Sequence, residues 1–178
     1  MTTTRFSDSY LNSLTQAANE SPRLRQSRTI HITPDDPCQR LFNAIDMDSY
    51  VRPHRHQQDP KVETLFAIKG RFLLVTFNEQ GEIEEVIPFH SEKYEARNDS
   101  GVGVEIQVGT WHTIIATEPH SILLEVKAGP FNLERSKEPA PWSPAEETEE
   151  GRAYLAQLKK RIGLNYVLIL SSDKTRGL

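Results

Sequence analysis

A series of short apolar runs, which fills the chain from about residue 28 to residue 128, constrains the fold more than any other feature. Turn-forming segments such as Pro34-Asp35-Asp36-Pro37 and Glu79-Gln80-Gly81 separate these runs. Nothing in this stretch has a helical period over the length of a helix. Many short strands joined by tight turns are typical of a β-sandwich or a β-barrel. The runs are Arg28–Ile32, Gln39–Ala44, Lys61–Ile68, Arg71–Asn78, Glu82–Phe89, Gly103–Val108, His112–Thr117 and Ser121–Lys127.

A helix is expected before this β-rich stretch. Residues 7–20 form an amphipathic pattern in which Leu11, Leu14 and Ala18 share one face. Ser7 is the expected N-cap, and Ser21-Pro22 the expected stop. The chain therefore predicts a short N-terminal helix that packs on the β structure.

A second helix is expected after it. The segment Ser143-Pro144-Ala145-Glu146 has a cap, a proline at the first helical position and a glutamate three residues after the cap. This pattern predicts a helix that runs to about Arg161. The tail beyond it has an apolar centre, Val167–Leu170. We expect the tail to pair with an edge strand or a second subunit, or to be loose.

Length and charge exclude several classes of protein. With 178 residues, the chain fits one domain, which we divide into a helical segment (1–27), a barrel (28–130) and a connector with helix and tail (131–178). A net charge of −4 spread along the chain argues against nucleic-acid binding. No run approaches the roughly 18 apolar residues of a membrane span. Cys38 is the single cysteine, so no internal disulfide forms, and the cytoplasm is the expected location.

Three histidines and one glutamate predict a metal site. On a strand, residues two apart point to the same face, so the rings of His54 and His56 converge. Glu63 opens the next strand after a turn, and a hairpin would bring it back beside them. His112 begins the strand after the turn at Gly109. Such nitrogen and oxygen donors suit one divalent transition metal, namely Zn, Fe, Mn, Ni or Co.

These residues resemble the two motifs of the cupin superfamily. The first motif, G-x5-H-x-H-x(3,4)-E-x6-G, falls on His54, His56, Glu63 and Gly70, although Asp48 stands at its first glycine. The second motif, G-x5-P-x-G-x2-H-x3-N, falls on Gly101, Gly109 and His112, with Gln107 and Ala116 at its proline and asparagine. The resemblance implies a jelly-roll-like β-barrel and the four ligands above. Six residues separate His56 from Glu63, so a three-histidine site with Glu63 as its neighbour is the alternative.

A narrower resemblance covers residues 28 to 145. The residues that carry it are Asn43-Ala44, Ser49–His56, Lys61-x-Glu63, Gly109-x-Trp111-His112 and Glu125-Val126-Lys127-x-Gly129-Pro130. In these segments the chain is similar to the WbuC-type cupin-fold metalloproteins of bacteria, which are often encoded among genes for surface-polysaccharide (O-antigen) synthesis. The resemblance implies a metal-binding cupin but no particular reaction. We expect the chain to act on a sugar, sugar phosphate or nucleotide sugar, and we expect a homodimer because cupin barrels commonly pair through their sheets.

Other residues near the expected site are candidates for binding substrate. Arg40 and Asn43 precede the ligands and are expected at the mouth of the barrel, where Arg40 contacts an anionic substrate or forms a structural salt bridge. Trp111 adjoins His112 and is expected either at the rim of the pocket or in packing. Arg52 and Arg55 alternate with the ligands, so at least Arg55 is expected to point away from the metal, in a solvated or interface role.

Three residues are candidates for acid–base catalysis. Glu125, Lys61 and Tyr50 all carry groups that exchange protons. Glu125 shares a strand face with Lys127, and the two are alternatively expected to pair with each other.

Three functions fit this ligand set. The first is a metal-dependent enzyme, of the isomerase or epimerase type, acting on a carbohydrate-derived substrate. The second is an Fe(II)-dependent dioxygenase. The third is a non-catalytic protein that binds a ligand through the metal. We prefer the first, with a small molecule rather than a nucleic acid or membrane as the partner.

Overall fold

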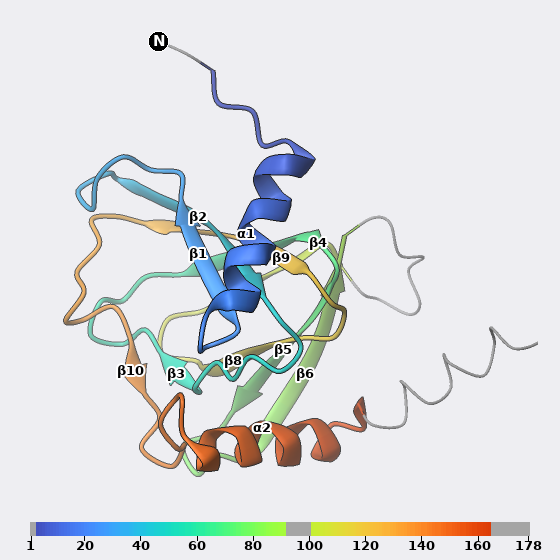
Figure 1. Cartoon of the computed structure of the whole chain (residues 1–178). Coiled ribbons are helices and arrows are strands. Elements are labelled where there is room, and N and C mark those ends of the chain that lie inside the picture. Colours follow the sequence, from blue (N-terminus) through green and yellow to red (C-terminus); the bar gives the residue numbers. More distant parts are fainter. Residues whose placement is uncertain (1–2, 92–100, 165–178) are drawn as a thin grey trace, which may run out of the picture.

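The protein is described by a computed structural model over residues 3–91 and 101–164. Two helices and ten strands form in these ranges (Figure 1). The helices are α1 (Asp8–Glu20) and α2 (Glu149–Arg161). The strands are β1 (Arg25–Thr29), β2 (Cys38–Ile45), β3 (His54–Arg55), β4 (Glu63–Lys69), β5 (Arg71–Phe77), β6 (Ile83–His90), β7 (Gly103–Ile106), β8 (Trp111–Ala116), β9 (Ser121–Ala128) and β10 (Glu138–Pro139).

The strands form two antiparallel sheets of five strands each. Sheet A has the order β1-β2-β9-β4-β7, and sheet B has the order β10-β3-β8-β5-β6. The flanking strands β1 and β10 can be set aside, and the remaining strands β2 to β9 numbered 1 to 8 along the chain. Sheet A then has the order 1-8-3-6, and sheet B has the order 2-7-4-5. This is the strand order of a jelly roll. The expected mainly β, cupin-like fold with a helix at each end is confirmed.

The space between the sheets holds one part of the apolar core. Strands alternate their side chains between two faces, so each inward face contributes every second residue. Leu65 and Leu123 of sheet A meet Phe72, Phe89 and Ile114 of sheet B there. His54, His56, Glu63 and His112 are buried in the same interlayer, so it is apolar at one end and polar at the other.

Each helix covers the outer face of a different sheet (Figure 1). Leu14 and Ala18 of α1 pack on Phe42 and Ile122 of sheet A. The outer face of sheet B is covered by α2 and by the connector before it. The residues buried in that contact include Val75, Phe77, Ile115, Leu155 and Leu158.

Most expected strand positions are correct, but the first is shifted. β1 covers Arg25–Thr29 instead of the expected Arg28–Ile32. Its position follows from pairing, since Arg25 lies opposite Ile45 and Thr29 opposite Leu41 of β2. An edge strand buries little surface, so its polar sequence carried no apolar signal.

The N-terminal helix has the expected boundaries. The Ser7 hydroxyl accepts a hydrogen bond of 3.3 Å from the Tyr10 amide, and the helix stops before Ser21. The second helix ends at Arg161 as expected, but its predicted start was wrong. It begins at Glu149, and the Thr148 hydroxyl accepts a 3.0 Å hydrogen bond from the Gly151 amide.

The displaced start of α2 has a physical cause. The Ser143 hydroxyl, expected as the cap, accepts a 3.0 Å hydrogen bond from Arg52 Nε. The Glu146 carboxylate accepts a 3.1 Å bond from the Arg52 amide and pairs with Arg25. Both side chains are therefore bound to the barrel instead of capping the helix. Glu147 then adopts a φ of 62°, which interrupts any helix before Thr148.

No helix within residues 3–91 and 101–164 is long and apolar enough to cross a membrane. The expected pairing of Val167–Leu170 lies outside the described residues.

Candidate metal centre

Four side chains from distant parts of the sequence converge between the two sheets. His54 of β3 and His112 of β8 are direct register partners in sheet B. Glu63 begins β4 in sheet A, and His56 directly follows β3. One potential ligand atom of each residue lies within 4.8 Å of the others, and all four residues are buried. These four residues are called the histidine–glutamate cluster below.

The six residues between His56 and Glu63 cross from one sheet to the other. β3 belongs to sheet B and β4 to sheet A, so the expected hairpin between them was wrong. The crossing places the carboxylate across the interlayer from the histidines, where Glu63 Oε2 lies 3.3 Å from His56 Nε2 and 3.5 Å from His112 Nε2. The long gap thus does not remove Glu63 from the cluster.

Backbone carbonyl groups hold all three imidazole rings by Nδ1. His54 Nδ1 lies 2.9 Å from the Arg52 oxygen, and His112 Nδ1 lies 2.8 Å from the Thr110 oxygen. His56 Nδ1 binds the carbonyl oxygen of Ser136. A carbonyl oxygen can only accept, so each Nδ1 carries the proton in a neutral ring and each Nε2 is left with a lone pair. This arrangement is the one that orients histidine ligands in metal sites.

The donor set fits a divalent metal. His56 Nε2 is buried and has no hydrogen-bond partner in the described structure, although buried polar atoms are normally paired. Burial, reinforced by the charge of Lys137, holds the pKa of His54 well below its ordinary value, so this ring is neutral. Three neutral imidazole nitrogens and one carboxylate oxygen suit Zn or another divalent transition metal.

A lysine on β9 keeps Glu63 ionised. Burial by itself would raise the pKa of Glu63, but the charge of Lys127 acts against it and lowers that pKa. The Lys127 ammonium lies 3.5 Å from Glu63 Oε1, the oxygen that does not face the His56 and His112 contacts. A carboxylate ligand is therefore available at neutral pH.

The polar network continues from Lys127 to Glu125. Lys127 Nζ lies 3.1 Å from Glu125 Oε1, and Asn43 Nδ2 donates a 2.9 Å hydrogen bond to Glu125 Oε2. Burial and the nearby charge of Glu63 raise the pKa of Glu125. Burial would lower the pKa of Lys127, but the carboxylates of Glu125 and Glu63 raise it, so the lysine stays charged. The expected pairing of Glu125 with Lys127 is confirmed.

A small cavity of roughly 70 Å³ adjoins the cluster inside the sandwich. His54, Glu63 and His112 form one part of its wall, and leucine, isoleucine and valine side chains form another. Asn43 and Glu125 are the two sequence candidates outside the cluster that line it. Both remain candidates for contact with a ligand.

Tyr50 and Lys61 do not line this cavity. The Tyr50 hydroxyl donates a 3.1 Å hydrogen bond to the Pro144 oxygen, and burial raises the pKa of this phenol. Lys61 Nζ lies 2.8 Å from Asp59 Oδ2 and also binds the Pro130 oxygen. Each side chain therefore fastens a neighbouring segment to the barrel.

Arg40 also lies away from the cavity. On β2, the side chains of Arg40 and Asn43 point to opposite faces of the strand. Arg40 shares its face with Phe42, which packs against α1. Its guanidinium lies 3.4 Å from Asp36 Oδ2. The structure therefore shows the salt bridge that the sequence left as the alternative to a substrate contact.

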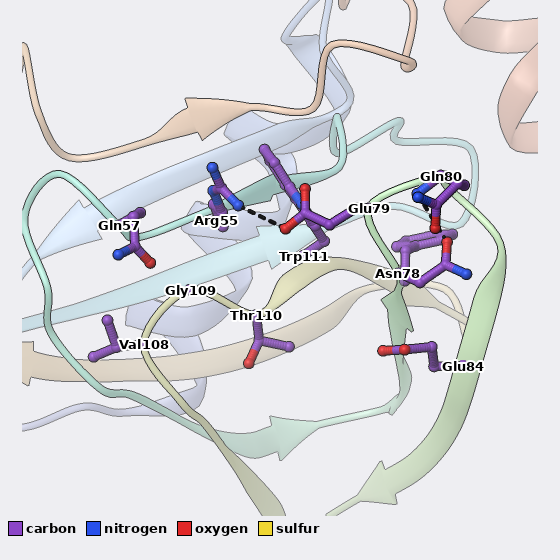
Figure 2. Close-up of a pocket in the computed structure, with 11 residues that line it drawn as sticks. Arg55, Gln57, Asn78, Glu79, Gln80, Glu84, Val108, Gly109, Thr110 and Trp111 are labelled. Carbon is purple, nitrogen blue, oxygen red and sulfur yellow. Dashed lines mark hydrogen bonds and ion pairs between the residues drawn. The ribbon is translucent and has the colours of Figure 1, made fainter.

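Trp111 and Arg55 lie on the outer side of sheet B. Figure 2 shows them at an open groove of about 610 Å³, together with Glu79. Trp111 Nε1 donates a 3.0 Å hydrogen bond to Glu79, and the Arg55 guanidinium lies 4.2 Å from the centre of the indole ring. Arg55 points away from the cluster as expected. It is not merely solvated, because it pairs with Glu79 and with Glu138 of β10.

Sequence reasoning missed three contributors to the site. Arg25 and Lys137 line the cavity, and the Ser136 carbonyl orients His56. Arg25 lies on the polar edge strand β1, and the other two residues lie in the segment between β9 and β10. No motif spacing signals them, because only the tertiary fold places these segments at the end of the sandwich.

Comparison with known proteins gives one family match and no curated relative. Residues 6–89 match the model of a domain of unknown function, DUF6016. No curated protein matches the sequence.

Three solved structures illustrate the similarity in fold. A structural-genomics protein from Shewanella oneidensis aligns with a TM-score of 0.50 at 9% identity, over 64% of this chain and 72% of that one. KdgF from Halomonas sp. aligns with a TM-score of 0.44 at 18% identity, over 62% and 83% of the two chains. Oxalate decarboxylase from Bacillus subtilis aligns with a TM-score of 0.45 at 16% identity, over 65% and 27%.

At such identities the similarity concerns the fold alone, and the strand order and the cluster come from the chain itself. The two sheets have the order of a jelly roll, and the histidines and the glutamate lie between them. The chain is a cupin-like β-sandwich with a buried cluster of three histidines and one glutamate that could hold a metal ion.

Proposed function

We propose that the chain binds one divalent transition metal and is an enzyme that acts on a small, oxygen-rich substrate. One observation carries the proposal. Three buried imidazoles are fixed through Nδ1 to backbone carbonyls, and their Nε2 atoms converge with a buried carboxylate. Without a cation, these lone-pair nitrogens and the carboxylate oxygen would be buried polar atoms without partners, which would cost stability.

The residues around the cluster suit catalysis. His54, His56, Glu63 and His112 would hold the metal, which supplies a Lewis acid that polarises a substrate oxygen. Glu125 lies in the cavity wall, and Asn43 and Lys127 each bind one of its two oxygens. Of the three acid–base candidates, Glu125 therefore has the position for proton transfer to a bound ligand. The apolar remainder of the wall would exclude bulk water.

The resemblance to WbuC-type proteins supports a substrate class. It favours a carbohydrate-derived molecule and a role in bacterial surface-polysaccharide synthesis, with the protein as a homodimer. The same donor set also suits Fe(II), so oxidative chemistry is the competing reaction. The identity of the bound metal distinguishes these possibilities.

Elemental analysis of untagged protein tests the metal site. We expect about one metal ion per chain in the wild type, and loss of nearly all of it in His54→Ala and in His112→Ala, because each variant removes a ligand. His120→Asn, which changes an exposed histidine outside the cluster, should keep its metal. Circular dichroism should show that each variant is folded.

Two results would contradict the proposal. One is a wild type that takes up no metal after reconstitution with Zn, Fe, Mn or Ni. The other is equal metal content in the wild type and both ligand variants. Bound iron together with oxygen uptake would move the function to an oxygenase.

A further inference from the structure

Two cationic side chains face the cavity beside the histidine–glutamate cluster. Arg25 reaches it from β1, and Lys137 reaches it from the segment just before β10. Neither residue belongs to the cluster, and neither comes from a strand that carries a ligand. Two separate parts of the fold thus bring positive charge to one small space.

Arg25 is held in place with donors to spare. Its Nη1 donates a 2.8 Å hydrogen bond to the Tyr50 oxygen, and its Nη2 binds the Glu146 carboxylate. A guanidinium has five N–H donors, so these two contacts fix its orientation and leave others for a ligand. The side chain is only 16% exposed, which strengthens any hydrogen bond that it makes to an anion.

Lys137 is placed differently. The residue is exposed at the mouth of the cavity, and among the described residues no hydrogen bond or ion pair engages its ammonium. A charged side chain at such a mouth attracts ligands of opposite sign.

The charges of the site favour an anion. Within the network, the carboxylates of Glu63 and Glu125 share Lys127, and Glu146 balances Arg25. Lys137 offsets the negative charge that this sharing leaves over, so a bound divalent metal would give the site a net positive charge. A ligand with a negative group would complete the balance.

The cavity limits the size of what enters. Its volume of roughly 70 Å³ is far below the roughly 300–1,000 Å³ of sites that enclose drug-sized ligands. A whole sugar does not fit inside it. A planar group of three heavy atoms does, and guanidinium binds a carboxylate in a bidentate geometry.

We propose that the ligand of this site bears a carboxylate, which enters the cavity between Arg25 and Lys137 next to the metal. The inference rests on the proposed function and adds the substrate class to it. The carboxylate belongs either to a small organic acid or to an acidic sugar whose remainder stays outside. Arg25 and Lys137 are then specificity-determining residues.

Titration calorimetry on zinc-loaded protein tests this, with zinc content measured on each sample first. The probes are acetate, D-glucuronate and D-glucose, of which the last two differ only in the carboxylate. We expect the wild type to bind a carboxylate probe and not glucose. Arg25→Gln and Lys137→Gln should each weaken that binding about tenfold or more, because each removes a charged partner of the anion. Their zinc content should not change.

Each variant has a matched control. Arg135→Gln removes an exposed charge from the same segment as Lys137, and Arg23→Gln removes one that lies 3.9 Å from the same Glu146 carboxylate as Arg25. Neither control residue lines the cavity, so both variants should bind within about twofold of the wild type. If Arg25→Gln fails to fold, Lys137→Gln still tests the proposal, because Lys137 is exposed and its side chain forms no hydrogen bond or ion pair among the described residues.

The possible results separate the two proposals. A wild type that takes up neither zinc nor Fe, Mn or Ni overturns the proposed function, and a wild type that takes up one of the other metals is tested in that loaded form. Three results with zinc-loaded protein overturn the carboxylate site alone. The protein binds neither acetate nor glucuronate, or it binds glucose as tightly as glucuronate. The third result is that Lys137→Gln and Arg135→Gln change the affinity for the carboxylate probe equally. Acetate binding as tight as that of glucuronate identifies a small acid, and tighter glucuronate binding identifies an acidic sugar.

Discussion

At the scale of single residues, the three histidines are oriented by two kinds of contact. His54 and His112 each bind the carbonyl two residues earlier in their own strand region. His56 binds the carbonyl of Ser136, which is 80 residues away. Two rings are thus oriented locally, whereas the third depends on the segment that precedes β10. Metal affinity should therefore be sensitive to changes that move the backbone of that segment at Ser136.

The lowered pKa of His54 predicts how the stability of the metal-free protein depends on pH. Burial keeps this ring neutral in the folded state, whereas the unfolded chain takes up a proton near pH 6.5. Below that pH the unfolded state binds more protons, so the free energy of unfolding should fall by up to about 1.4 kcal/mol per pH unit from this group. Denaturant unfolding at pH 7.5 and pH 5.5 measures the change.

His54→Asn should flatten this pH dependence. The variant removes the group that binds the proton in the unfolded state, and the window lies above the ordinary pKa of carboxylates. The raised pKa of buried Glu125 acts in the opposite direction, but Glu125 is present in both proteins and does not account for a difference between them. His120→Asn, at an exposed position with a φ of 58° that asparagine tolerates, should keep the slope of the wild type. Identical slopes in His54→Asn and the wild type would exclude His54 as the cause.

At the scale of elements, α2 supports the segment before β3, the strand that carries His54 and is followed directly by His56. Gly151 of α2 lies against Tyr50, shortly before β3, and a Cβ built there would meet the Tyr50 ring at 2.9 Å and the Ala145 oxygen at 2.6 Å. Glycine is therefore required for close approach at this helix position. Arg52 strengthens the same contact by binding Ser143 and the Ala140 oxygen.

Gly151→Ala should destabilise the protein. In an exposed helix the change would stabilise by about 1 kcal/mol, but overpacking a buried contact costs about 1–3 kcal/mol, so the net effect is a loss. Thermal and denaturant unfolding measure it. Arg152→Ala, at the adjacent exposed position, should change stability by less than about 0.5 kcal/mol. A more stable Gly151→Ala would mean that α2 moves away from Tyr50 at no cost.

At the scale of the whole molecule, the cluster joins the two sheets. Glu63 comes from sheet A, whereas His54 and His112 come from sheet B. A metal bound by these residues would cross-link the layers of the sandwich. Binding that is specific to the folded state would then stabilise the entire fold and not only one loop.

Metal should raise the stability of the whole domain in one transition. At a free zinc concentration about a hundredfold above the dissociation constant, the free energy of unfolding should rise by about 2.7 kcal/mol, and a chelator should reverse the gain. Calorimetry with and without zinc measures the shift in Tm. Glu63→Gln should reduce it, whereas Glu105→Gln, on the exposed side of edge strand β7, should not. An equal shift in both variants would show that zinc binds elsewhere.

The sequence by itself determined the β-rich layers, both helices and the four residues of the cluster. The layers and helices follow from local properties, namely the alternation of apolar residues, turn formers and helix caps. The spacing of His54 and His56 indicated two of the ligands, and the resemblance to the two cupin motifs added Glu63 and His112.

The tertiary structure decided the rest. The start of α2 moved to Glu149 because Ser143 and Glu146 bind the barrel. Tyr50, Lys61 and Arg40 form hydrogen bonds or a salt bridge elsewhere on the barrel, and none of them lines the cavity. Arg25 and Lys137 line the cavity, although no sequence motif indicated them. Contacts between segments distant in sequence depend on how the two sheets pack, and they produce no periodic pattern in the sequence.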